Sequence, residues 1–262
     1  MSAFILRRLL IAIPTLLVIA TASFFLMRAA PGGPFDAEAD LEPEVLENIR
    51  AAYNLDKPLL EQFRIYVSNA LRGDFGPSLV YKDFTVTELV AIGLPVSVKL
   101  GASAMLVALL LGGVAGIIAA LRQNHLIDHA IMAMAMTGIA IPSFVVAPIL
   151  ALFFGLYLKL LPVAGWNDGA WQNMILPVTA LALPQVAIIA RLLRGGMLEV
   201  LRSNFVRTAR AKGLSETRVV LAHVLRSALI PLVGYLGPAL AGIMTGSLVI
   251  ELIFNLPGVG RY

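Results

Sequence analysis

Long uncharged stretches recur along the chain and are separated by shorter segments that carry most of the charge. Crossing the hydrocarbon core of a bilayer as a helix takes roughly 20 apolar residues. Five stretches meet this length, namely residues 9–27, 100–121, 130–158, 169–190 and 227–250. The pattern therefore predicts an all-α, polytopic membrane protein with five spans.

Prolines are expected to shape two of these spans. Residues 130–158 are longer than a straight span needs, so Pro142 and Pro148 are predicted to kink this stretch or to separate an interfacial piece from it. Pro177 and Pro184 are predicted to interrupt the next span.

The segment 29–94 differs in composition, with eleven acidic and five basic residues. Cytosolic segments are enriched in Lys and Arg, so an acidic segment is expected outside. Pro43 and Pro58 stand where helices can start, which predicts two short amphipathic helices here. We expect an N-terminal segment with the first span (1–28), an extracytoplasmic helical insert (29–94) and a membrane core (95–262).

Residues 191–226 hold eight basic and two acidic residues. A net charge of +6 in a short segment between two spans places it in the cytosol. The N-terminus, with Arg7 and Arg8, is also expected in the cytosol, and the end of the chain, after five spans, outside. Because topology accounts for the basic charge, we expect no nucleic-acid partner. We expect the spans to be in contact with membrane lipid.

Composition excludes several kinds of chemistry. The chain is 59% hydrophobic and 14% charged, whereas about a quarter of the residues of a soluble protein are charged. With no cysteine, thiol catalysis and cysteine metal sites are excluded. His125 and His129 flank Asp128 in a way that superficially resembles a metalloprotease helix, but a third ligand would have to be a carboxylate, which favours a polar turn at the cytosolic interface and no metal site. No phosphate-binding GxxxxGK[ST] loop is present.

The basic segment also has a helical pattern. Gly213 follows a helix-forming stretch as a plausible stop, and Ser215 is suited to cap a new helix that continues into the last span. A short helix with small residues at its centre and cationic flanks fits a groove on a soluble partner. The alternative is that the basic residues only fix the topology of the chain in the membrane.

Residues 205–213 read FVRTARAKG and are followed by Leu214 and by HVLR from His223. This stretch resembles the cytoplasmic signature loop of permease subunits of ATP-binding-cassette importers, in the form found in the peptide and nickel group. The general signature has Glu-Ala-Ala, three residues, Gly, nine residues and Ile-x-Leu-Pro; this chain keeps Ala209, Gly213 and Leu225 but has Arg207, Thr208, His223 and Arg226 at four other positions. Those departures are typical of the peptide branch.

The resemblance extends over essentially the whole chain. The stretches that resemble the first permease of oligopeptide importers are FILRR from Phe4, APGGP from Ala30, GDFGPS from Gly73, TGIAIPSF from Thr137 and IFNLPGVG from Ile253. The resemblance implies a type I ABC importer transmembrane domain in a bacterial inner membrane. That family has six spans, so the sixth is expected to be missing from this sequence.

The resemblance also implies partners and site residues. The partners would be a homologous second permease, two ATP-binding subunits that hold ATP and Mg²⁺, and an extracytoplasmic peptide-binding protein; this chain would bind no cofactor. Residues 191–226 would be the coupling loop, with contacts from Arg207, Thr208, Ala209, Arg210, Ala211, Lys212 and Gly213. Polar residues at membrane depth are weak candidates for the translocation path, namely Thr137, Thr179, Gln185 and Thr245.

Other functions remain open at this stage. Within the importer class, the substrate could be a dipeptide, a modified peptide or nickel. An ATP-independent channel or secondary transporter would need its own coupling groups at the midplane, and an intramembrane enzyme would need a catalytic constellation there. From residue 100 to residue 190 the only acids are Asp128 and Asp168, both expected at the interface.

Overall fold

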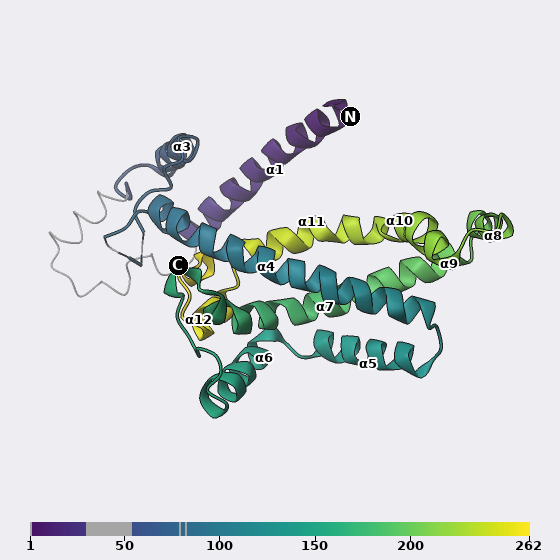
Figure 1. Ribbon diagram of the computed structural model, residues 1–262. Coiled ribbons are helices and arrows are strands. Elements are labelled where there is room, and N and C mark those ends of the chain that lie inside the picture. The colour runs from purple at the N-terminus through teal and green to yellow at the C-terminus, as the bar shows by residue number, and fades with distance from the viewer. Residues whose placement is uncertain (1, 30–53, 79, 82) are drawn as a thin grey trace. The chain divides into compact units, whose positions relative to one another are not determined.

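A computed structural model of the chain describes residues 2–29, 54–78, 80–81 and 83–262. The chain divides into two compact units, Met1–Leu89 and Val90–Tyr262 (Figure 1). Within the described ranges the structure is helical, and its one β pairing is an isolated bridge between Pro77 and Thr85. The prediction of an all-α chain is confirmed.

The first unit contains helices α1 (Ser2–Ala29) and α3 (Leu59–Ala70). The helix expected after Pro58 is confirmed as α3, whereas the one expected after Pro43 lies outside the described residues. Phe63 of α3 packs with its ring 5.3 Å from that of Phe24 on α1. Arg28 donates a hydrogen bond of 2.7 Å to Gln62 Oε1, so α3 is held against the end of α1.

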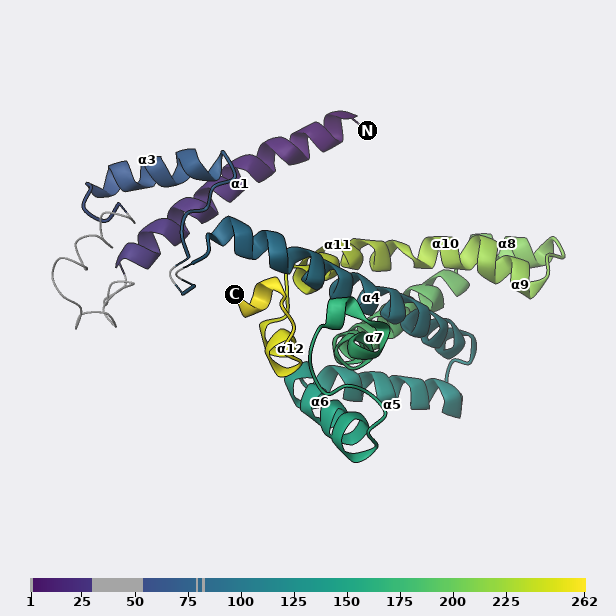
Figure 2. The same cartoon turned by 60° about the vertical axis from the view of Figure 1, so that its left-hand side comes forward.

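Helix α7 lies at the centre of the second unit, and α4, α5, α6, α10, α11 and α12 lie around it (Figure 2). Glycines allow α4 to approach α7 closely, because a β-carbon on Gly112 or Gly116 would lie 2.7 Å from a backbone oxygen of α7. The main elements are α4 (Val86–Leu121), α5 (Leu126–Ala140), α6 (Ser143–Leu150), η2 (Ala151–Tyr157), α7 (Trp171–Leu201), α8 (Asn204–Ala211), α9 (Glu216–Arg218), η4 (Val219–Val224), α10 (Leu225–Ala228), α11 (Ile230–Met244) and α12 (Leu248–Ile253). Short 3-10 turns, η3 (Asn167–Gly169) and η5 (Val259–Arg261), complete the unit.

The described residues contain four to five candidate spans, compared with five predicted. Four helical stretches are long and apolar enough to cross a membrane, namely Ile5–Ala29, Val86–Leu121, Trp171–Leu201 and Ile230–Ile253. A fifth candidate is the pair Leu126–Ala140 and Ser143–Tyr157, bent by 98°. The bend lies at Ile141 and Pro142, as expected, because proline disfavours a helical conformation of the residue before it. Pro148 was also predicted to cause a kink or a division, but α6 continues through it.

Two details of the spans differ from the sequence prediction. Pro177 and Pro184 were expected to interrupt their span, but α7 runs through both without a break. Neighbouring helices pack around the buried Pro177, and such packing lets a membrane helix tolerate a proline. Helix α4 also begins at Val86 instead of residue 100, and α7 continues to Leu201, beyond the predicted end at residue 190.

A buried carboxylate holds the turn after α12. Glu251 is only 2% exposed, and its Oε1 accepts a hydrogen bond of 2.7 Å from Ser97 Oγ on α4. Ser97 Oγ in turn accepts a bond of 2.9 Å from the backbone N–H of Val259. This network ties α4 to α12 and to the LPGVG turn, and it was not predicted from the sequence.

Candidate functional site

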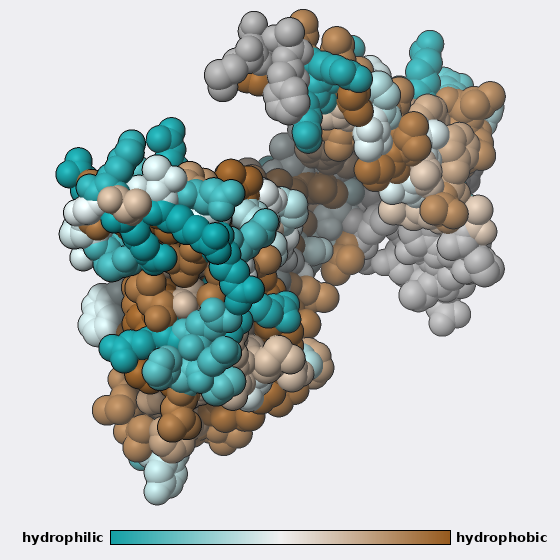
Figure 3. All heavy atoms as spheres, turned by 90° about the vertical axis from the view of Figure 1, so that its right-hand side faces the viewer, coloured by the Kyte–Doolittle hydropathy of each residue, from teal (hydrophilic) through white to brown (hydrophobic). Residues whose placement is uncertain are grey.

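The basic segment 191–226 is helical over most of its length. Its first part, including Arg191 and Arg194, belongs to α7, which continues past the predicted end of the span at residue 190. After a short turn come α8 and then a second helical run from α9 through η4 to α10. Figure 3 views the molecule from this end and shows hydrophilic residues gathered there, with hydrophobic residues along the flanks.

Helix α8 has one buried and one exposed face. Val206 and Ala209 are buried in an apolar cluster with residues of α4, α7, η4 and α10. Phe205 is 49% exposed and is joined on the outer surface by basic and small residues. These exposed residues are Arg207, Thr208, Arg210, Ala211 and Lys212. Of the seven residues predicted for coupling, only Ala209 faces inward.

Gly213 ends α8 in a left-handed conformation, with φ of +78°. Its N–H donates to Arg210 O at 2.9 Å, and the N–H of Leu214 donates to Ala209 O at 3.4 Å. These two bonds form the Schellman arrangement that satisfies the last carbonyls of a helix. The predicted stop at Gly213 is therefore confirmed, and Ser215 stands at the predicted N-cap of the next helix.

An exposed ion pair bridges the Gly213 turn. Arg210 Nε lies 2.7 Å from Glu216 Oε1, and Arg210 Nη2 lies 3.1 Å from Oε2. The hydrogen bonds from Arg210 lower the pKa of the Glu216 carboxyl below its usual value. The pair joins α8 to α9. Because exposed ion pairs contribute little to the free energy of unfolding, its main effect here is to favour one conformation of the Gly213 turn.

The second helical run contains a π-helical segment, η4. Val219 and Val224 are five residues apart, and both are fully buried in the cluster that contains Val206. A π-helix has i→i+5 hydrogen bonds, so residues five apart share a face. This geometry brings both valines into the cluster on which α8 rests.

The predicted residues of the translocation path make two kinds of contact. The hydroxyls of Thr137, Thr179 and Thr245 each donate to a carbonyl four residues earlier in their own helix. Gln185 Oε1 instead accepts a hydrogen bond from the hydroxyl of Tyr235, which joins α7 to α11. Tyr235 was not identified from the sequence, because spacing along one helix does not reveal a partner on another.

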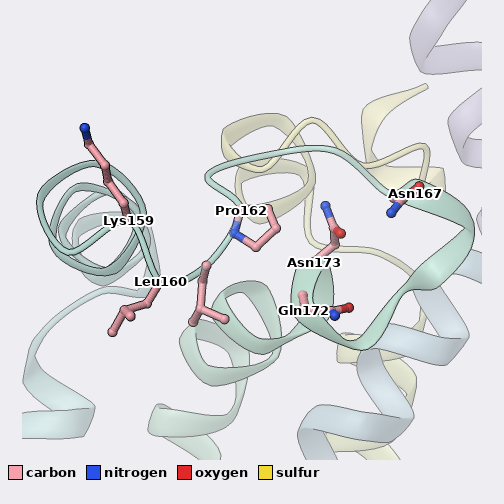
Figure 4. Close-up of a pocket in the computed structure, with 7 residues that line it drawn as sticks. Lys159, Leu160, Pro162, Asn167, Gln172 and Asn173 are labelled. Atoms are coloured by element: carbon pink, nitrogen blue, oxygen red, sulfur yellow. The ribbon is translucent and has the colours of Figure 1, made fainter.

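Nothing among the described residues forms a group of three or more potential metal ligands. Asp128, between the two histidines, is engaged by Arg194 on α7. A hollow of about 520 Å³ lies near the other end of α7, lined in part by Lys159, Asn167 and Asn173 (Figure 4). Lys159 extends away from the amides in this view, so these polar groups do not converge on one point.

Comparison with known proteins agrees with this architecture. Residues 112–262 match the family described as the binding-protein-dependent transport system inner membrane component, and residues 1–79 match the N-terminal family of such membrane components. The chain belongs to this permease family. The permease is therefore a multi-pass transport subunit of the inner membrane.

Several relatives are similar to the permease over its full length. The oligopeptide transport system permease protein OppB of Salmonella typhimurium is 56% identical over 261 residues, covering 100% of this chain and 85% of the relative. OppB of Escherichia coli K12 is 55% identical with the same coverage. The dipeptide transport system permease protein DppB of Bacillus subtilis is 43% identical over 262 residues, covering 100% of this chain and 84% of the relative.

A solved structure shows the same fold. The crystal structure of an amino acid ABC transporter with histidines matches 67% of this chain and 76% of its own chain, with a TM-score of 0.50 and 18% identity. The helical arrangement is therefore that of an ABC transporter membrane domain.

Proposed function

We propose that the permease forms half of the membrane channel of an ATP-driven oligopeptide importer. Its identity to the oligopeptide permease of Salmonella typhimurium, 56%, exceeds its 43% identity to a dipeptide permease of Bacillus subtilis. The partners in this proposal are a homologous second permease, two subunits that bind ATP and Mg²⁺, and an extracytoplasmic peptide-binding protein. Import of dipeptides, modified peptides or nickel is the alternative within the same class.

The observation that carries the proposal is the construction of α8. Its inner face is fixed in the apolar cluster, and its outer face presents Phe205 among small and basic residues. This surface suits a groove on a partner, and its place directly after α7 gives it a mechanical connection to a span. ATP-driven movement of the partner would then rock the spans between inward-open and outward-open states.

The proposed orientation places α8 and the N-terminus in the cytosol and the insert 29–94 outside. The net charge of +6 in residues 191–226 supports it. In the translocation path we propose Gln185 together with Tyr235, since this polar pair connects two spans. Thr137, Thr179 and Thr245 stay predictions for the path, each with its hydroxyl proton directed to its own helix.

Reconstitution with the partner subunits in lipid vesicles tests the proposed function. Peptides longer than two residues, delivered by the binding protein, are expected to stimulate ATP hydrolysis and to accumulate inside the vesicles. Stimulation by dipeptides or nickel alone would transfer the proposal to those substrates. Uptake that continues without ATP would identify a channel or secondary transporter instead.

Reversing two charges on α8 tests its contact with the ATPase. The double variant Arg207→Glu, Arg210→Glu is expected to lower the amount of ATPase subunit that co-purifies with the permease by about tenfold. Like charges placed together at a contact cost several kcal/mol, and about 1.4 kcal/mol already corresponds to a tenfold change in affinity. Lys159→Glu, an exposed reversal remote from α8 in the chain, is the control and should leave recovery unchanged. Unchanged recovery in the double variant would mean that the charges serve topology only.

A further inference from the structure

An acid at the start of α5 is buried and fully engaged. Asp128 lies in the first turn of α5 and is completely buried. Arg194 of α7 donates to it from both Nε and Nη2, each at 2.6 Å, and the backbone N–H of Asn124 donates at 3.0 Å. Such a bidentate pair fixes the direction as well as the distance of a contact.

Arg194 lies within the part of α7 that supports α8. Leu193 precedes it, and Met197 follows three residues later; both are buried in the apolar cluster that contains Val206 and Ala209 of α8. A β-carbon on the nearby Gly196 would lie 2.8 Å from Ala228 O of α10, so α7 and α10 are in close contact here. The same part of α7 therefore shares an apolar cluster with α8 through Leu193 and Met197 and binds Asp128 through Arg194.

Helix α5 leads away from this pair to the bend of 98° before α6. Along the way α5 meets α7 at small residues: a β-carbon on Gly138 would lie 3.4 Å from Ala187 Cβ. Apolar contacts of this kind bring α5 close to α7, but they are non-directional and do not tie one particular residue of α5 to one of α7. The ion pair, by contrast, requires Asp128 to follow Arg194.

We propose that the Asp128–Arg194 ion pair transmits displacement of α8 to the broken span formed by α5 and α6, which makes these two residues positioning residues for coupled transport. The inference rests on the proposed role of α8 in ATPase docking. Motion of α8 moves the end of α7 through the apolar cluster, and the ion pair makes α5 move with it. Loss of the pair leaves α8 docked but removes this charged link, so that α5 follows the movement of α7 less closely.

The test compares Asp128→Asn with wild type in vesicles that contain the partner subunits. The amide keeps the shape of the carboxyl but loses its charge and one acceptor oxygen, while the unpaired Arg194, whose side chain is 24% exposed, can reach water. We expect peptide transported per ATP hydrolysed to fall at least about fivefold, with the amount of co-purified ATPase near wild type. The thermal midpoint is expected to fall, because breaking a buried ion pair destabilises the fold, so transport is normalised to the amount of inserted protein. Asp168→Asn, an exposed acid-to-amide change, is the matched control.

Arg194→Lys is the second variant, since it keeps the charge but loses the paired donors. It is expected to give a similar loss and keeps the test decisive if Asp128→Asn lowers the amount of inserted protein. An unchanged ratio of transport to hydrolysis in both variants would overturn the inference, as would a loss of ATPase recovery, which would place the defect in docking. If wild type itself shows no ATP-coupled uptake, the proposed function fails instead.

Discussion

Gly213→Val is expected to abolish ATP-driven peptide uptake, with a loss of at least about tenfold, while the chain stays inserted in the membrane. The φ of +78° at this position is a conformation that a β-branched residue adopts only at a cost of roughly 1–2 kcal/mol or more. A valine would therefore disfavour the two hydrogen bonds that close α8. With eight residues, α8 is too short to hold its shape without its cap and its packing.

Gly213→Asn separates backbone conformation from side-chain size. A β-carbon here would meet nothing within 4 Å, so neither variant causes a steric clash inside the chain. Asparagine tolerates the left-handed conformation, and this variant should retain most of the uptake. Uptake in membrane vesicles and ATPase recovery would be measured for both. Normal uptake by the valine variant would refute the role of the Gly213 turn in coupling. An equal loss of uptake in both variants would mean that any side chain at this position disturbs the surface that contacts the ATPase.

The spans could be predicted from the sequence because each is long, uncharged and bounded by polar residues. The bend at Pro142 was also predictable, since proline and the residue before it both oppose a continuous helix. Pro177 and Pro184 gave the wrong expectation because the same local rule is overridden where neighbouring helices pack around the proline. Hydropathy likewise could not show that α7 continues past Arg191 and Arg194, because charges end a hydrophobic pattern without ending a helix.

The features of the candidate site that follow from local sequence were predicted, namely the small and basic residues of α8 and its stop at Gly213. The polar contacts between helices were not predicted. Asp128 and Arg194 are 66 residues apart, Gln185 and Tyr235 are 50 apart, and Ser97 and Glu251 are 154 apart. Periodicity indicates which face of a helix is polar, but the partner depends on which helices become neighbours. The signal that the sequence did offer for these contacts was a charged or polar residue in or near a span. This signal identified at most one of the two residues in each contact.

Gly258→Ala is expected to destabilise the second unit by on the order of 2–4 kcal/mol. Its φ of −89° and ψ of 170° suit any residue, so the backbone does not require glycine. A β-carbon, however, would overlap the carboxyl group of Glu251, which is buried and cannot move away without breaking its bond from Ser97. The substitution therefore combines overpacking with the loss of a buried hydrogen bond.

Gly113→Ala is the matched control for that experiment. It also adds one β-carbon, but nothing lies within 4 Å of it, and alanine in the interior of α4 favours the helix by about 1 kcal/mol. The thermal midpoint of the detergent-solubilised protein, followed by loss of the monodisperse peak in size-exclusion chromatography, compares the two. Gly258→Ala should melt well below wild type and Gly113→Ala at or slightly above it. Equal midpoints would show that the LPGVG turn adapts around Glu251, and that this buried carboxylate does not constrain the end of the last span.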